Sequence, residues 1–79
     1  MENDSKIYKF IIFCLEHYKH FRQITAIQSL SLFRQTGAFQ YLAEGYDVLH
    51  TQSRDYIVAD IDDFIHNHAK KFYEKQKIK

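Results

Sequence analysis

The stretch SKIYKFIIFCLEHYKHF, residues 5–21, decides the fold class, because its apolar residues recur at steps of three and four. That spacing is typical of an amphipathic helix, in which such positions share one face. Asp4 or Ser5 can cap the start of this helix. The residues expected on its buried face are Ile7, Phe10, Ile11, Cys14, Leu15, Tyr18 and Phe21.

A second helix is predicted directly after this stretch. Thr25 and Gln28 have the spacing of a capping box, in which each side chain binds the backbone amide of the other residue. The helical pattern then continues to Gly37, which stands where the end of a helix favours a residue that tolerates positive φ. The same reasoning predicts a short third helix, AFQYLAE (38–44), which stops at Gly45.

Residues 46–52 are expected to add another helical turn or two, with Val48 and Leu49 inward. The segment 53–72 has two interpretations. In the first, Tyr56-Ile57-Val58 is a short extended piece, and Asp60 caps a last helix from about Ile61 to Phe72. In the second, Ser53 caps one longer helix. The β-branched residues Ile57 and Val58 favour the first interpretation.

The composition of the chain also predicts a helical fold. The 79 residues include no proline and two glycines, too few turn residues for an all-β chain. We therefore expect an all-α fold, a compact single-domain bundle of four to five helices, with a short extended segment near 56–58. The domain spans 1–79, with a basic C-terminal tail at 70–79. The expected core is Ile7, Phe10, Ile11, Cys14, Ile27, Leu30, Phe33, Phe39, Leu42, Leu49, Ile57, Ile61 and Phe64.

Charge is distributed unevenly along the chain. Residues 70–79 carry five Lys and one Glu, whereas residues 1–69 hold six Lys or Arg and nine Asp or Glu. The acidic body makes nucleic acid an improbable partner, although the tail keeps a nucleic-acid-associated role open as the alternative function. The start of the chain has neither the basic segment of a signal peptide nor an apolar run long enough for a membrane span. With a single cysteine, this pattern predicts a cytoplasmic protein without a membrane partner.

No pattern places catalytic or metal-binding groups together. Cys14, His17 and His20 spread over about 120° of helix surface, which does not converge on a tetrahedral metal site. His50 and Ser53 lie near Asp47 and Asp55, but no glycine-rich turn supplies the geometry of a nucleophilic triad. The acidic residues Asp60, Asp62 and Asp63 are interpreted as the start of a helix. We expect no catalytic residues, no metal and no cofactor.

The segment GYDVLHTQSRDYIVADIDDFI carries a resemblance to a known family. Its pattern L-H-T-x4-Y-I-V-x-D-I is matched by Leu49, His50, Thr51, Tyr56, Ile57, Val58, Asp60 and Ile61. The chain resembles an uncharacterised family of short bacterial helical proteins, a domain of unknown function, over roughly residues 7–66. Ser53 departs from the pattern, since glycine is more usual there.

Members of that family are often encoded beside an ADP-ribosyltransferase-like protein, in an arrangement similar to toxin–antitoxin cassettes. The resemblance therefore implies a small non-catalytic interaction module, antitoxin-like, whose partner is another protein. Self-association as a homodimer is the main rival, because seven Phe and six Tyr exceed what so small a core normally hides. His50 and Thr51 are expected to tie the joint between helices through hydrogen bonds. The expected partner-binding residues are Tyr41, Tyr46, His50, Thr51, Gln52, Arg54 and Tyr56.

Overall fold

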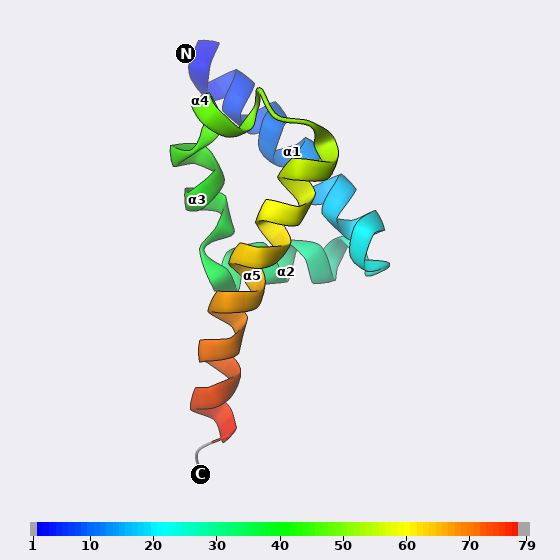
Figure 1. Ribbon diagram of the computed structural model, residues 1–79, viewed down its shortest axis with the longest axis vertical. Coiled ribbons are helices and arrows are strands. Elements are labelled where there is room, and N and C mark those ends of the chain that lie inside the picture. Colours follow the sequence, from blue (N-terminus) through cyan, green and yellow to red (C-terminus); the bar gives the residue numbers. More distant parts are fainter. Residues whose placement is uncertain (1, 78–79) are drawn as a thin grey trace.

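The fold is built from helices joined by short connections. The computed structural model describes the backbone of residues 2–77 and the side chains of residues 4–69. Over residues 2–77 the chain forms five helices and no strand (Figure 1), which confirms the predicted all-α bundle. They are α1 (Glu2–Arg22), α2 (Ala26–Thr36), α3 (Ala38–Glu44), α4 (Tyr46–Leu49) and α5 (Arg54–Lys77).

The two long helices organise the molecule. α1 and α5 cross each other, α2 packs against both, and α3 and α4 carry the chain from the end of α2 back to the start of α5 (Figure 1). The second half of α5 extends beyond the other helices, so the longest dimension is 47 Å against 24 and 21 Å. Within residues 2–77, none of these helices has the length and apolar character that crossing a bilayer requires.

One hydrophobic core lies between α1, α2, α3 and α5. Its centre includes Tyr18, Phe33 and Ile61, which are almost completely buried. Ile11, Phe39 and Phe64 from the predicted core pack against its edge. The buried apolar residues are Phe10, Cys14, Tyr18, Phe33, Ala38, Leu42, Leu49, Ile57, Val58, Ile61 and Ile65.

Four side chains predicted to point inward are exposed instead: Ile27 (78%), Val48 (68%), Phe21 (53%) and Leu30 (37%). Ile27 and Leu30 lie outside because α2 turns a different stripe toward the core, in which Ser29, Phe33 and Thr36 are buried. The small side chain of Ser29 allows α2 to approach α1 closely, so the larger residues beside it lie outside.

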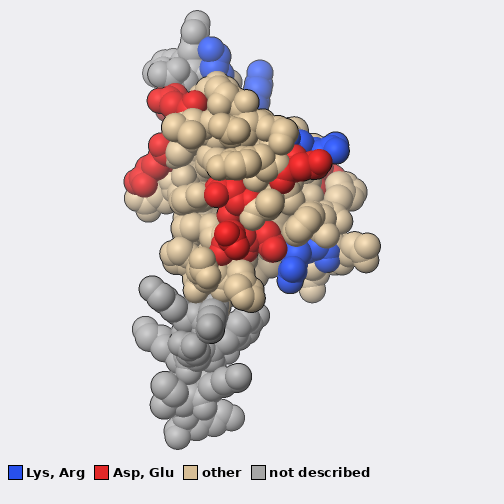
Figure 2. Space-filling model, viewed as in Figure 1, with Lys and Arg blue, Asp and Glu red and all other residues tan. Residues whose placement is uncertain are grey.

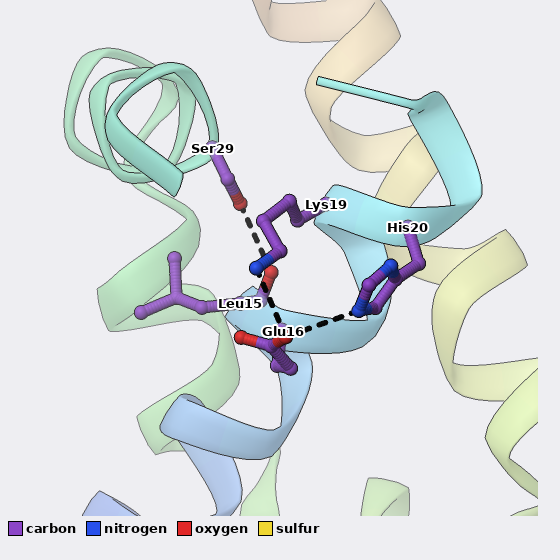
Figure 3. A network of polar contacts seen from close by, with 5 residues as sticks. All are labelled: Leu15, Glu16, Lys19, His20 and Ser29. Atoms are coloured by element: carbon purple, nitrogen blue, oxygen red, sulfur yellow. Dashed lines mark hydrogen bonds and ion pairs between the residues drawn. The ribbon is translucent and has the colours of Figure 1, made fainter. Parts of the chain in front are cut away.

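Ser29 also joins the two helices directly. Its hydroxyl donates to the carbonyl oxygen of Leu15 at 3.2 Å, as Figure 3 shows. On the exposed side of the same turn, the Glu16 carboxylate pairs with Lys19 at 2.9 Å and with His20 at 3.0 Å. The hydrogen bond from Lys19 is the main reason that the pKa of Glu16 is lowered.

The helix ends agree with the sequence at some points and differ at others. The Thr25 hydroxyl accepts from the Gln28 amide at 3.1 Å, and the Gln28 side chain accepts from the Thr25 amide at 3.0 Å, which confirms the capping box. Gly37 has φ of 81°, as predicted. Gly45 ends α3 but has φ of −93°, so it needs no positive φ. Its role is spatial, because a Cβ there would lie 3.1 Å from Leu49 Cδ1.

α1 begins earlier than the sequence indicated, at Glu2, so neither Asp4 nor Ser5 is its cap. The far end of α1 closes with Gln23 at φ of 56°. The Gln23 amide donates to the His20 carbonyl and the Ile24 amide donates to the Lys19 carbonyl. These two bonds form the Schellman motif, in which glycine is the usual left-handed residue.

The predicted extended segment at 56–58 is wrong, and the interpretation as one longer helix is right. α5 begins at Arg54, and the Ser53 side chain accepts from the Tyr56 amide at 3.1 Å. Ile57 and Val58 are both buried inside the helix. Their burial outweighs the modest preference of β-branched residues for extended backbone, which amounts to a fraction of a kcal/mol.

Asp60, Asp62 and Asp63 therefore lie inside α5 and not at the helix start that the sequence had indicated. The Asp62 carboxylate accepts from the Tyr18 hydroxyl at 2.9 Å, and the Asp60 carboxylate accepts from the Tyr41 hydroxyl at 2.6 Å. Burial is the main cause that raises the pKa of Tyr18. Figure 2 shows acidic side chains gathered over the middle of this face, with lysine and arginine side chains at its margins.

Candidate partner-binding groove

One side of α1 borders two adjoining hollows. α1 contributes Lys6, Lys9, Phe10 and Phe13 to the first, and His17, His20 and Phe21 to the second. These residues follow one another at steps of three, four or one, so they lie along one side of the helix. The opposite wall of the first hollow comes from α4, from the connection that follows it and from α5, whereas that of the second comes from the first turns of α5 alone.

The first hollow, of about 400 Å³, has an apolar floor. Phe10 and Ile57 are buried beneath it, while Phe13 stands at its edge with 37% of its surface exposed. Tyr46 closes the far wall, with its ring edge-on to Phe10 at a centroid distance of 5.4 Å. A side chain entering this hollow would therefore meet aromatic surface on three sides.

The connection between α4 and α5 is held by its own side chains. The His50 ring lies parallel to the Tyr46 ring at 4.3 Å, and His50 Nδ1–H donates to the Tyr46 carbonyl at 2.6 Å. Because that carbonyl can only accept, Nε2 is the ring atom left available to a ligand. The Thr51 hydroxyl donates to the Val48 carbonyl at 2.8 Å. The prediction that His50 and Thr51 tie this joint is confirmed.

The second hollow continues the first along α1. It measures about 610 Å³ and has Phe21, 53% exposed, at its edge and Val58 buried in its floor. The rings of Phe13 and His17 lie 4.2 Å apart where the two hollows adjoin. We call the two hollows together the α1 groove; the remaining residues of its second part are His20, Arg54 and Asp55.

The rim of the α1 groove is mainly basic. Lys6 and Lys9 line its first part, and Arg54 lines the second. Asp55, the acidic residue of the lining, lies 3.6 Å from Arg54 at the exposed start of α5. Among the side chains of residues 4–69, neither Lys6 nor Lys9 belongs to an ion pair.

The sequence-predicted partner residues fall into two groups. Tyr46, His50, Gln52 and Arg54 line the α1 groove. Tyr41, Thr51 and Tyr56 do not line it. Of these, Thr51 and Tyr56 are exposed.

Tyr41 is half-buried because its ring stacks on Phe64 at 4.2 Å and its hydroxyl binds Asp60. That hydrogen bond is the main cause that raises the pKa of Tyr41 to about 12. Tyr41 therefore joins α3 to α5, and its hydroxyl is already occupied.

Sequence reasoning missed the α1 side of the groove. Phe13 lies just outside the apolar stripe of α1, beside Cys14, and Lys6 and Lys9 also fall off that stripe. The sequence did contain a signal for this side of the groove. Ile11, Ile12 and Phe13 form a continuous apolar run, which is wider than the single buried stripe of an amphipathic helix requires. Phe72 and Tyr73, two further aromatic residues that fall off the apolar stripes in the sequence, lie outside the described side chains.

The chemistry-bearing residues have structural roles in this fold. Cys14 is fully buried, and burial raises the pKa of its thiol to about 12, which disfavours the nucleophilic thiolate. Ser53 caps α5. Over the described residues, His, Cys, Asp and Glu side chains do not gather in groups of three or more that could hold a metal ion.

These features define a small all-α protein with an aromatic groove along its first helix. The chain belongs to a family described as "Protein of unknown function (DUF3791)", whose model matches residues 9–68. That range includes most of the α1 groove and the whole connection between α4 and α5. No curated protein and no solved structure matches the chain.

Proposed function

We propose that this protein is a non-catalytic interaction module that binds another protein along the α1 groove. The observation that carries the proposal is the position of Phe13 and Phe21, exposed aromatic side chains at the edges of hollows with buried apolar floors. Aromatic residues in such positions dominate the binding energy of protein interfaces. A domain of 79 residues also gains stability when a partner binds its folded state.

We further propose that the partner is the co-encoded ADP-ribosyltransferase-like protein and that the role is antitoxin-like, in the cytoplasm. This step is supported by the resemblance at residues 49–61, a segment that contributes His50, Gln52 and Ile57 to the lining of the groove. The nucleic-acid alternative depends on residues 70–79, whose side chains lie outside the described range.

A homodimer has its own supporting observation on a different surface. Ile12 is 53% exposed and borders a hollow between α1 and α2 that Leu30 also lines. Ile27, still more exposed, stands on the same helix as Leu30. Self-association through this face would leave the α1 groove free, so the two functions can be tested separately.

The test is site-specific photo-crosslinking in the native host. A benzophenone side chain replaces Phe13 in the groove, Ile27 on the α1–α2 face or, as a control, the exposed Arg34 of α2. We expect a covalent adduct with the ADP-ribosyltransferase-like protein at position 13, and none at position 34. An adduct of twice the chain mass at position 27, with none at position 13, would replace the proposal with a homodimer.

A further inference from the structure

We infer that the occupant of the α1 groove is an acidic amphipathic helix of the partner, lying along α1. The inference rests on the proposed function and adds the chemistry of the partner segment. It predicts apolar side chains on one face of that segment, inserted into the groove, with carboxylates along the side that faces Lys6 and Lys9.

The shape fits a helix. The lining residues of α1 run from Lys6 to Phe21. At 1.5 Å per residue this interval spans about 22 Å, the length of roughly four helical turns. The apolar floor is interrupted midway by the Phe13–His17 ring pair. A helix that places apolar side chains at successive turns matches two hollows in a row, as in other helix-in-groove complexes.

The charge fits an acidic partner. Lys6 and Lys9 lie on consecutive turns of α1, both on the groove side, and both are exposed. Neither lysine has an ionic partner among the side chains of residues 4–69, so carboxylates on the incoming helix could pair with them without breaking an ion pair within that range.

A second copy fits poorly in this groove. A two-fold dimer presents the same patch on both copies, so a groove with a mainly basic rim would face another groove with a mainly basic rim. Like charges facing each other across an interface oppose association. The chain's own segment 70–79, with five Lys and one Glu, has the same sign of charge and is disfavoured for the same reason.

Nucleic acid is also a poor match. Lys6, Lys9 and Arg54 would attract its backbone, and the exposed rings of Phe13 and Phe21 could stack on bases. A polar, charged nucleotide chain would nevertheless gain little from the buried apolar floor of the groove. The acidic residues that Figure 2 shows over the middle of the molecule would repel phosphates along a longer track. A protein helix uses both the apolar floor and the basic rim.

The test uses two fluorescent peptides of about 15 residues, acetylated and amidated, with identical leucines on one helical face. One carries glutamates beside the leucines and the other carries lysines. Fluorescence anisotropy with the full chain should show the glutamate peptide binding at least about tenfold more tightly. Changing Lys6→Glu and Lys9→Glu together should reverse the preference, and Phe13→Ser should weaken both peptides.

The control is a double variant of equal charge, Lys19→Glu with Arg34→Glu. Neither of these residues lines the groove, so the preference for the glutamate peptide should persist. Equal binding of the two peptides, no binding of either, or tighter binding of a 15-nucleotide oligo-dT would overturn the inference. If the partner still crosslinks at position 13, any of these results overturns the inference of an acidic helix but leaves the proposed function standing. Loss of that crosslink overturns the proposed function itself.

Discussion

The Tyr18 hydroxyl donates a 2.9 Å hydrogen bond to the Asp62 carboxylate, across 44 residues of sequence and between the two longest helices. Tyr18 is 1% exposed, so its ring fills the core while its oxygen reaches the boundary where Asp62 lies. Arg22, one turn further along α1, lies 3.6 Å from the same carboxylate oxygen. These contacts fix the orientation in which α5 crosses α1, and therefore the position of the α5 wall of the α1 groove.

Tyr18→Phe should lower the free energy of unfolding by about 1–2 kcal/mol, because it removes a hydrogen bond to a charged group but keeps the ring. Asp62 is partly exposed and retains Arg22, which limits the loss. Urea denaturation monitored by circular dichroism measures the change. The control is Tyr8→Phe, at a side chain that is 70% exposed, and it should have no effect. Equal stability of the two variants would show that the Tyr18–Asp62 bond is energetically neutral.

Ser29 should be intolerant of larger side chains. Ser29→Ala removes the hydrogen bond to Leu15 and should destabilise by about 1 kcal/mol. Ser29→Leu should destabilise by about 1–3 kcal/mol, because the added atoms force α2 away from α1. The control is Ser31→Ala, at a less buried position of the same helix. It gives the same gain in helix propensity but leaves the hydrogen bond between Ser29 and Leu15 in place. A stable Ser29→Leu variant would mean that the two helices can separate without loss.

Two substitutions of Ser53 test whether its side chain caps α5. Ser53→Ala should destabilise by about 1 kcal/mol, whereas Ser53→Gly should lose only a few tenths, since glycine is tolerated at this position. Thermal unfolding of the two variants gives the comparison. Ser5→Ala serves as control, because Ser5 lies inside α1 and caps nothing. Identical losses at position 53 would show that the hydroxyl does not act as a cap.

Local signals in the sequence predicted local structure well. The capping box at Thr25 and Gln28 and the left-handed Gly37 each depend on a few neighbouring residues, and both are present. The error at α5 arose where two local signals competed. Ser53 and Asp60 both resemble caps, and the choice between them is decided by Ile57 and Val58 packing into a core that comes from distant segments.

The groove was harder to predict because it depends on tertiary placement. Tyr46 and His50 were expected to contact a partner, but nothing in the sequence placed them opposite Phe13. The orientation of α2 was hard to predict for the same reason. A stripe through Ile27 and Leu30 and one through Ser29 and Phe33 both have helical spacing, and the close approach to α1 selects the stripe with the small residue.

The end of α1 offers a stabilising substitution. Gln23 has φ of 56°, a conformation that strains a residue with a Cβ and that glycine adopts freely. Gln23→Gly should therefore raise the free energy of unfolding by about 0.5–1 kcal/mol, despite the greater flexibility of the unfolded chain. The same change at Gln35, inside α2, should lower it. Loss of stability at both positions would show that the left-handed turn carries no strain.

Alkaline pH should destabilise the fold through Cys14 before it acts through the tyrosines. Burial raises the pKa of the Cys14 thiol from 9.0 to about 12, and the pKa of Tyr41 rises from 10.0 to about 12. A group whose pKa is raised by folding stabilises the protein below its unfolded pKa, and this contribution is lost as pH rises toward the folded value. The free energy of unfolding should thus fall from pH 9 onward, and more steeply above pH 10.

Cys14→Ala separates the thiol from the phenols. The smaller side chain lowers stability at every pH, so the informative quantity is the slope and not the absolute value. Between pH 9 and about pH 12 the variant should lose less stability per pH unit than the wild type, because it lacks the thiol, and both curves should steepen above pH 10 as the tyrosines contribute. Urea titrations at half-unit steps measure both curves. Parallel curves from pH 9 to 11 would show that the thiol ionises as freely in the folded protein as in the unfolded chain, contrary to its complete burial on the core side of α1.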